Sequence, residues 1–239
     1  MIVVFLHGFT HTGRSWDPVV AALGERYTAI APDIRGHGDA SGSEPVTLDA
    51  VVADVGALVS QRFTLVGYSM GGRIALHVAL ADSARIERLV LIGASPGLAD
   101  PSERGRRQAD DEALANELQR STIDEFATRW ARTPVLAGLP PQIAAAAHAD
   151  RLRSNPVGLA RALRGLGTGA LPPLWDRLGE LSMPVTLLVG GRDRKFQAIA
   201  AQMAAAIAHA RTDVIAGAGH AVHLEAPGVV AAAVSDTSC

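Results

Sequence analysis

The sequence is poor in cysteine and in lysine, and it has no long hydrophobic run. Its single cysteine, Cys239, is the last of 239 residues, so no intrachain disulfide is possible and a reducing compartment such as the cytoplasm suits the chain. No apolar stretch approaches the roughly 20 residues of a membrane span. The net charge of -2 argues against nucleic acid or an anionic membrane as a partner, and nothing indicates an oligomeric state. One lysine, Lys195, stands against 21 arginines.

Short β-branched runs alternate with Ala- and Leu-rich stretches along most of the chain. The first apolar run, residues 1–6, is short and has no basic residues before it, so we interpret it as a strand and not as a signal peptide. The alternation predicts a mostly parallel sheet with helices on both faces. The predicted strands are residues 2–6, 28–31, 63–66, 88–92, 185–189 and 211–215.

Residues 98–173 break the alternation because no convincing strand occurs in them. Helices are predicted at residues 110–118, 123–131, 142–152 and 157–166, and Asn155-Pro156 is typical of a helix start. We therefore expect one α/β core, formed by residues 1–97 and 174–239. A helical cap, residues 98–173, would be inserted between two core strands and cover the catalytic edge of the sheet. The chain begins almost directly on the first predicted strand, so we expect either a sheet that is short at that edge or a trimmed start.

The motif Gly67-Tyr68-Ser69-Met70-Gly71 is a G-x-S-x-G nucleophile elbow. It lies between a predicted strand and a predicted helix, residues 72–81, which is the context that the α/β-hydrolase fold requires. In that fold the loop after the first strand and the residue after the nucleophile each supply one amide to an oxyanion hole. Here these amides belong to Phe9 and Met70, while His7 shapes the loop.

An acid and a histidine follow the last two predicted strands. Asp193 ends the segment Gly190-Gly191-Arg192-Asp193, and His220 ends Gly217-Ala218-Gly219-His220. The order Ser, Asp, His is that of α/β-hydrolase triads, in which the acid orients the histidine and the histidine takes the serine proton. Among the other histidines, His223 is the main rival and His11 is close enough in sequence to Phe9 to reach the pocket. We predict the triad Ser69, Asp193, His220.

The triad alone leaves the reaction open, because the same groups can attack a carbonyl carbon or remove a C–H proton next to a carbonyl. No Cys/His ligand cluster and no G-x-G-x-x-G after a strand appear in the sequence. We therefore expect neither a metal nor an organic cofactor.

Longer segments are more specific than the elbow. They are residues 5–9 (FLHGF), 66–73 (VGYSMGGR), 95–98 (SPGL), 103–107 (ERGRR), 152–155 (LRSN), 163–169 (LRGLGTG), 193–196 (DRKF) and 219–223 (GHAVH). With these segments the chain resembles, over nearly its whole length, the 2-succinyl-6-hydroxy-2,4-cyclohexadiene-1-carboxylate synthases of menaquinone biosynthesis, the MenH family.

The resemblance implies a lyase that removes a ring proton and expels pyruvate from 2-succinyl-5-enolpyruvyl-6-hydroxy-3-cyclohexene-1-carboxylate. It also implies cationic groups that hold the substrate's three carboxylates. By resemblance these are Arg73, Arg107 and Arg153, with Tyr68 and Trp130 as further pocket residues. The neighbours of Arg107 at positions 104 and 106 are arginines too, and the sequence does not fully separate the three.

Two other readings remain open at this point. A serine carboxylesterase or thioesterase would use the same triad through an acyl-enzyme on Ser69, although an apolar acyl chain needs no arginines. A binding protein without catalytic activity is a third reading, and the complete triad argues against it.

Overall fold

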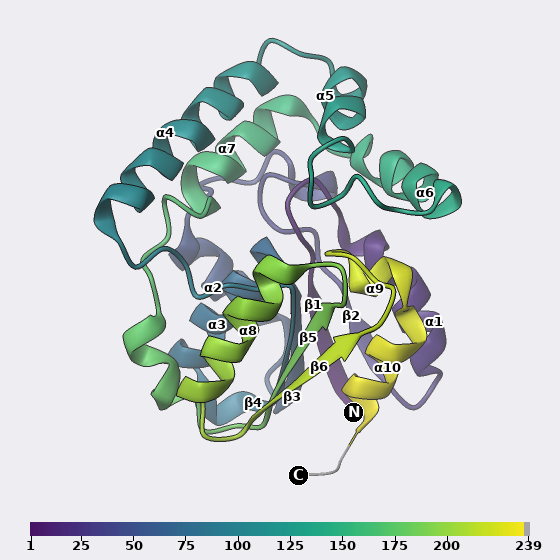
Figure 1. The fold of residues 1–239 in the computed structure, drawn as a ribbon, viewed down its shortest axis with the longest axis vertical. Helices are drawn as coiled ribbons and strands as arrows, with labels where there is room; N and C mark the ends of the chain where they lie inside the picture. Colours follow the sequence, from purple (N-terminus) through teal and green to yellow (C-terminus); the bar gives the residue numbers. More distant parts are fainter. Residues whose placement is uncertain (237–239) are drawn as a thin grey trace.

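The computed structural model describes residues 1–236, so Cys239 lies outside the described residues. Six parallel strands form one sheet in the order β2-β1-β3-β4-β5-β6 (Figure 1). Each prediction for a strand is right to within two residues at either end. The strands are β1 (Ile2–Leu6), β2 (Thr28–Ile30), β3 (Phe63–Tyr68), β4 (Ile86–Ile92), β5 (Val185–Gly190) and β6 (Ala210–Ile215).

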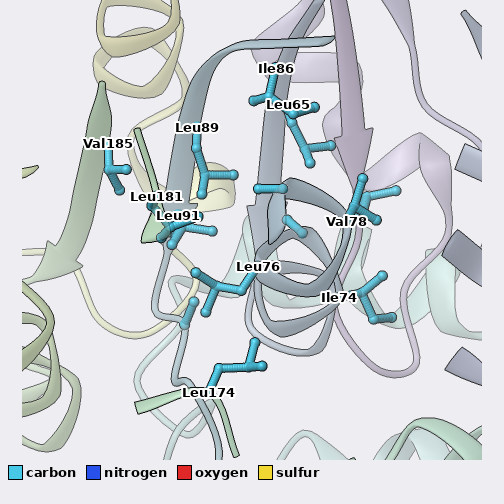
Figure 2. Packing of buried hydrophobic residues seen from close by; sticks show 14 of the residues in the cluster. Leu65, Ile74, Leu76, Val78, Ile86, Leu89, Leu91, Leu174, Leu181 and Val185 are labelled. Atoms are coloured by element: carbon cyan, nitrogen blue, oxygen red, sulfur yellow. The ribbon is translucent and has the colours of Figure 1, made fainter. Parts of the chain in front are cut away.

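Parallel strands are covered by helices on both faces, so nearly all their side chains are buried. The sequences of β1, β3 and β5 are therefore mostly apolar and do not alternate between apolar and polar residues. One face carries α2 (Leu48–Leu58), α3 (Met70–Ala81) and α8 (Arg194–Ala206), which share the larger buried cluster with the sheet. Figure 2 shows part of it, where Leu76 of α3 packs against Leu91 of β4.

The other face of the sheet is covered by the two ends of the chain. Helices α1 (Asp17–Leu23), α9 (Val222–Glu225) and α10 (Pro227–Ser235) pack there in a second buried cluster that contains Trp16. Short 3-10 helices lie between the longer elements: η1 (Gly13–Trp16), η2 (Gly38–Ala40), η3 (Ser83–Arg85) and η4 (Trp175–Glu180).

Four helices lie between β4 and β5 and gather at one end of the molecule (Figure 1). They are α4 (Pro101–Leu118), α5 (Ile123–Trp130), α6 (Pro141–Arg151) and α7 (Pro156–Leu166). We call residues 98–173 the cap segment. Its own small core joins α4, α5 and α7, and Phe9 and Trp130 pack against that core.

Helix α4 begins at Pro101, nine residues before the predicted start at residue 110. The helix starts there because the Asp100 carboxylate accepts a hydrogen bond from the Glu103 amide and Pro101 occupies the first turn. Residues 101–110 are almost entirely polar and exposed, so no apolar periodicity marks them.

Candidate active site

The turn that carries Ser69 is held in an unusual conformation. Ser69 has φ 52° and ψ -110°, between the end of β3 and the start of α3. Such a backbone is costly for a residue other than glycine, by roughly 1–3 kcal/mol, and persists only where its surroundings enforce it. Gly71 shows how tight they are, because a Cβ atom there would lie 2.2 Å from the Leu6 carbonyl oxygen. The turn presents the Ser69 hydroxyl at the N-terminus of α3.

The structure brings the three predicted triad residues together. The Nδ1 atom of His220 donates to Oδ2 of Asp193 at 2.6 Å, and Nε2 of His220 lies 3.1 Å from the Ser69 Oγ. The Asp193 carboxylate also accepts from the Phe196 amide at the start of α8, which fixes its orientation. With Nδ1 protonated, Nε2 is free to accept the Ser69 proton, so the geometry is that of a general base and its nucleophile.

The rival histidines have other environments. His223 is fully buried, and its ring packs 4.1 Å from Tyr68 and 4.8 Å from Trp16, centroid to centroid. Burial lowers the pKa of His223 well below the usual value, so its ring stays neutral. His11 donates from Nδ1 to Asp150 at 2.9 Å. Neither ring is bonded to Ser69.

A cavity of about 210 Å³ opens beside the triad, with Ser69 and His220 in its wall. Of the other predicted site residues, Phe9, Met70, Arg73, Arg107 and Trp130 line it. Its remaining lining is mostly apolar or comes from the end of α7 and the start of α8: Val135, Ala162, Leu163, Leu166, Gly167, Thr168, Lys195 and Phe196.

Both predicted oxyanion residues, Phe9 and Met70, line this cavity. Met70 is the first residue of α3, so its amide has no carbonyl partner within the helix. The Phe9 ring packs edge-on against Trp130 of α5, with the ring centroids 5.3 Å apart. Both residues line the cavity that contains Ser69, so their amides remain our candidates for the oxyanion donors.

The two arginines of the cavity are held in different ways. Arg73 is 6% exposed, and its Nε donates to the Ser95 carbonyl at 3.4 Å. Burial, and then repulsion from Arg107, lowers the pKa of Arg73 to about 10, while Asp111 opposes the shift. Arg107 is half-exposed and donates from Nε to Asp111 at 2.8 Å. A pKa of about 10 leaves Arg73 charged at neutral pH, and an anion between the two guanidiniums would relieve their repulsion.

The structure separates Arg107 from its neighbours. Arg106 is exposed, and Arg104 donates to the Leu98 carbonyl at 3.5 Å. Neither lines the cavity, whereas Arg107 does.

Two residues assigned by resemblance do not line this cavity. Arg153 lies between α6 and α7 and lines a separate cavity of about 690 Å³ with Arg14, Asp17 and Asp39. Tyr68 is buried, and its ring lies against the backbone at Gly8, where a Cβ atom would meet it at 2.7 Å. Arg153 therefore faces another cavity in this structure, and the Tyr68 ring packs next to His220, with the ring centroids 5.3 Å apart.

No role was predicted for Lys195, which lines the cavity together with Arg73 and Arg107. One signal in the sequence points to it. Lys195 is the only lysine of the chain and stands two residues after Asp193, at the start of the helix that the Asp193 carboxylate caps.

Within residues 1–236, no three His, Cys, Asp or Glu side chains are grouped so that they could hold a metal ion. None of the helices in this part of the chain has the length and apolar character needed to cross a membrane.

Comparison with known proteins identifies the family. Residues 3–233 match the model of the Alpha/beta hydrolase family. The 2-succinyl-6-hydroxy-2,4-cyclohexadiene-1-carboxylate synthase of Salmonella paratyphi C (strain RKS4594) is 36% identical over 237 residues, which cover 95% of this chain and 90% of that protein. The synthase of the same name from Enterobacter sp. (strain 638) is 34% identical over 239 residues, 98% of this chain and 90% of the other.

A comparison with solved structures supports the same family. The structure of MenH from S. aureus superposes with a TM-score of 0.93 at 32% identity, covering 98% of this chain and 92% of that one. The chain belongs to the Alpha/beta hydrolase family and, within it, to the family of 2-succinyl-6-hydroxy-2,4-cyclohexadiene-1-carboxylate synthases.

Proposed function

We propose that the protein is a lyase that eliminates pyruvate from 2-succinyl-5-enolpyruvyl-6-hydroxy-3-cyclohexene-1-carboxylate. The product is 2-succinyl-6-hydroxy-2,4-cyclohexadiene-1-carboxylate, the compound in the names of its relatives. The observation that carries the proposal is one cavity that contains both the Ser69–His220 pair and the guanidiniums of Arg73 and Arg107. We also propose a cytoplasmic location, supported by a sequence with one cysteine.

The elimination needs a base and a site for negative charge. Ser69 takes the ring proton next to the succinyl ketone while His220 takes the Ser69 hydroxyl proton. The electron pair of the broken C–H bond moves through the enolate and breaks the C–O bond to the enolpyruvyl group. That group leaves and becomes pyruvate on taking up a proton, which restores neutral His220. The Phe9 and Met70 amides hold the enolate oxygen.

The charges in the cavity match a small substrate with several carboxylates. Arg73 and Arg107 offer planar forks that bind a carboxylate through two hydrogen bonds, and Lys195 adds a point charge. The wall contributed by Trp130, Leu163 and Leu166 suits the ring. Three cations and an apolar patch in one cavity select a cyclic anion over a neutral ligand.

The same apolar wall supports a second candidate, a carboxylesterase or thioesterase that acylates Ser69. An acyl chain would fill the apolar side of the cavity but leave Arg73 and Arg107 without an anionic partner. Binding of a neutral ligand would keep their repulsion unrelieved, so we prefer the lyase.

A paired measurement separates the two candidates. Pyruvate release and hydrolysis of a small neutral ester are measured for the wild type and for Arg73→Ala, Arg107→Ala and Lys195→Ala. A charge-assisted contact is worth roughly 1.5–3 kcal/mol, so Arg73→Ala should lower kcat/KM for pyruvate release about 10- to 150-fold. The half-exposed Arg107 should matter less, and Arg73→Lys should recover only part of the loss.

Arg153→Ala is the matched control, because it removes an arginine of the cap segment that lines another cavity. It should leave both activities close to wild type. If Arg73→Ala and Arg107→Ala lowered both activities equally, or neither, the carboxylate-binding role would be wrong and the esterase would become the better account.

A further inference from the structure

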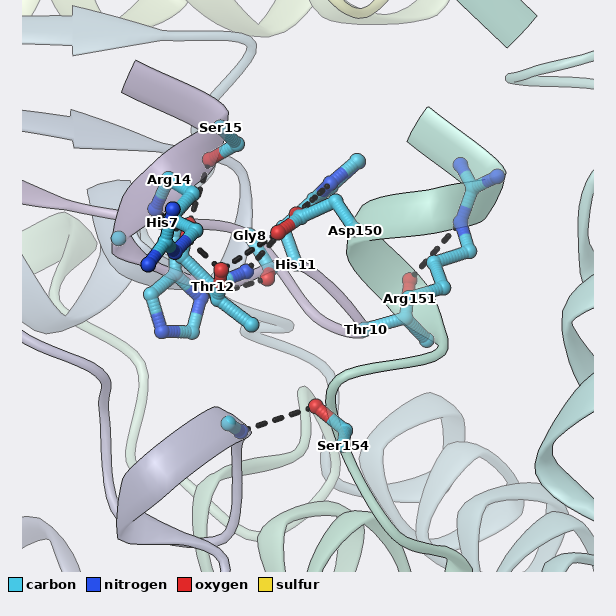
Figure 3. A network of polar contacts seen from close by, with 12 residues as sticks. His7, Gly8, Thr10, His11, Thr12, Arg14, Ser15, Asp150, Arg151 and Ser154 are labelled. Carbon is cyan, nitrogen blue, oxygen red and sulfur yellow. Dashed lines mark hydrogen bonds and ion pairs between the residues drawn. The ribbon is translucent and has the colours of Figure 1, made fainter. Parts of the chain in front are cut away.

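Two consecutive residues of the cap segment, Asp150 and Arg151, are buried against the loop that follows β1. They end α6, and their exposed fractions are 8% and 1%. Figure 3 shows both side chains reaching from α6 to residues 10–12 of the core. In the rest of α6 only Ala147 is buried, so the buried side chains of this helix are mainly the charged ones of Asp150 and Arg151.

The Asp150 carboxylate accepts three hydrogen bonds from two neighbouring residues. Its Oδ2 accepts from Nδ1 of His11 at 2.9 Å and from the amide of Thr12 at 3.0 Å. Its Oδ1 accepts from the Thr12 hydroxyl at 2.5 Å. His11 and Thr12 are both buried, so solvent does not compete for these bonds.

Arg151 adds a fourth contact one residue earlier in the loop. Its Nε donates to the Thr10 hydroxyl at 3.3 Å. Thr10 is fully buried and has φ 71°, a left-handed backbone that a β-branched residue adopts only where its surroundings enforce it. The cap segment therefore holds three consecutive residues, 10, 11 and 12, through directional bonds.

A polar contact of this kind is a costly way to attach a helix. Burying a carboxylate and a guanidinium requires removing their water, and apolar side chains of similar size would often stabilise the contact more. What the polar contact provides is direction, because each hydrogen bond restricts both distance and angle. Bonds that fix the position of residues 10–12 also restrict the backbone of the residue just before them, Phe9.

Phe9 is held by the cap segment on its side chain as well. Its ring packs against Trp130 at 5.3 Å and Phe126 at 6.5 Å between centroids, both on α5. The backbone amide of Phe9, our proposed oxyanion donor, thus lies between a ring contact to α5 and the bonded residues 10–12. We propose that Asp150 and Arg151 are positioning residues that set the Phe9 amide of the oxyanion hole, so that the seating of α6 on the core completes the catalytic site.

This inference rests on the proposed role of Phe9 at the Ser69 site. It predicts an effect on kcat, because an oxyanion hole acts on charge that develops in the transition state and not on the bound substrate. Loss of a whole donor in such a hole costs about 100- to 1,000-fold, so a displaced donor should cost about 10- to 100-fold.

The experiment compares Asp150→Ala with a matched control in the cap segment. Asp150→Ala should lower kcat for pyruvate release about 10- to 100-fold with KM within about twofold of wild type. Asp150→Asn keeps an oxygen that accepts from the Thr12 amide, and should recover part of the rate. Asp124→Ala is the control, because Asp124 also bonds a histidine, His148 at 3.0 Å, but on the exposed surface. It should leave kcat unchanged.

A second reaction keeps the test independent of the substrate. A fluorophosphonate reacts with Ser69 by forming an O–P bond and breaking the P–F bond, while His220 takes the hydroxyl proton and the phosphoryl oxygen occupies the oxyanion hole. Labelling of Ser69 is followed by mass spectrometry, which also counts the active sites to which kcat is normalised. Its rate constant should fall with Asp150→Ala in parallel with kcat.

The outcomes separate the two proposals. If the wild type releases no pyruvate, the proposed lyase function fails, while the labelling rates still decide the positioning role. Should folded Asp150→Ala label and turn over like wild type, or should only KM rise, the positioning role is overturned. If Asp150→Ala does not fold, Asp150→Asn and Thr12→Val decide by the same kcat and labelling criteria.

Discussion

At the scale of single residues, Gly93 shows how closely the catalytic histidine is packed. It follows β4 with φ 51°, and a Cβ atom there would lie 2.8 Å from Cε1 and 2.9 Å from Nδ1 of His220. The Nδ1 atom is the one that bonds Asp193. Glycine at this position lets the backbone come close enough to support the ring without displacing it.

Gly93→Ala should therefore lower kcat, because the added methyl group pushes the His220 ring away from Ser69. A displacement of about 1 Å in a catalytic group costs on the order of 100-fold in rate. Gly24→Ala is the control, since Gly24 has φ 73° but no atom within 4 Å of an added Cβ. Both positions have a positive φ, so equal activity in the two variants would contradict a specific contact at His220. Turnover and urea unfolding measure both effects.

The triad yields a second prediction at this scale. Ser69→Ala, His220→Ala and Asp193→Asn should each remove most pyruvate release while the protein stays folded, because triad members act as a unit. A Ser69→Ala, His220→Ala double variant should be little worse than the worse single variant. Nearly normal turnover by His220→Ala, combined with loss in His223→Ala, would show that the base is the other histidine.

At the scale of elements, the position of Arg107 on α4 depends on a contact between α4 and the turn after α7. The buried Asp111 carboxylate accepts from Arg107 Nε at 2.8 Å and from the Gly169 amide at 3.3 Å. Asp111 lies one helical turn after Arg107, so the pair shares one face of α4. This bond keeps a half-exposed side chain directed into the cavity.

Asp111→Ala should raise KM for the anionic substrate more than it lowers kcat, because Arg107 keeps its charge but loses its orientation. A rise of about tenfold corresponds to one lost charge-assisted contact. The unpaired Gly169 amide should also cost about 1–3 kcal/mol of unfolding free energy. Glu112→Ala is the control at the next position, since Glu112 bonds Arg164 on the exposed surface. An unchanged KM in Asp111→Ala would contradict the anchoring role.

At the scale of the whole molecule, several histidines are buried in their neutral form. Burial lowers the pKa of His7 to about 4, of His37 to about 3 and of His77 to about 4. His7 shows the structural reason most clearly, because its Nε2 accepts a hydrogen bond from the Ile34 amide and so must stay unprotonated. In the unfolded chain each of these rings takes up a proton near pH 6.5.

The protein should therefore lose stability in mild acid. Below pH 6.5 the unfolded state binds more protons than the folded one, so the unfolding free energy falls as pH falls, and continues to fall until the folded pKa is reached. Each such histidine contributes up to about 1.4 kcal/mol per pH unit between pH 6.5 and roughly 4. Urea unfolding at pH 7.5, 6.5 and 5.5 measures the slope, and His77→Leu should flatten it. A stability that is flat from pH 7.5 to 5 would contradict neutral burial.

The sequence by itself determined the sheet and the triad. Strands buried on both faces are short apolar runs, so their positions are visible in the sequence, and the turns after β3, β5 and β6 carry Ser69, Asp193 and His220. Because parallel strands present their carboxyl ends at one edge, the order of these turns was enough to bring the three residues to the same edge. The polar first half of α4 was missed. A helical segment that begins at a capping residue and is exposed to solvent needs no periodic apolar residues, so the sequence shows no helical period there.

Only the tertiary structure decided which cations reach the active site. Arg107 and Lys195 lie on α4 and α8 and line the Ser69 cavity, whereas Arg153 lies in the turn between α6 and α7 and lines another cavity. The bonds from Asp150 to residues 11 and 12 were equally hidden, because they join positions 138 and 139 residues apart. Local pattern specifies the elements, whereas contacts between distant side chains depend on how helices of the cap segment sit on the core.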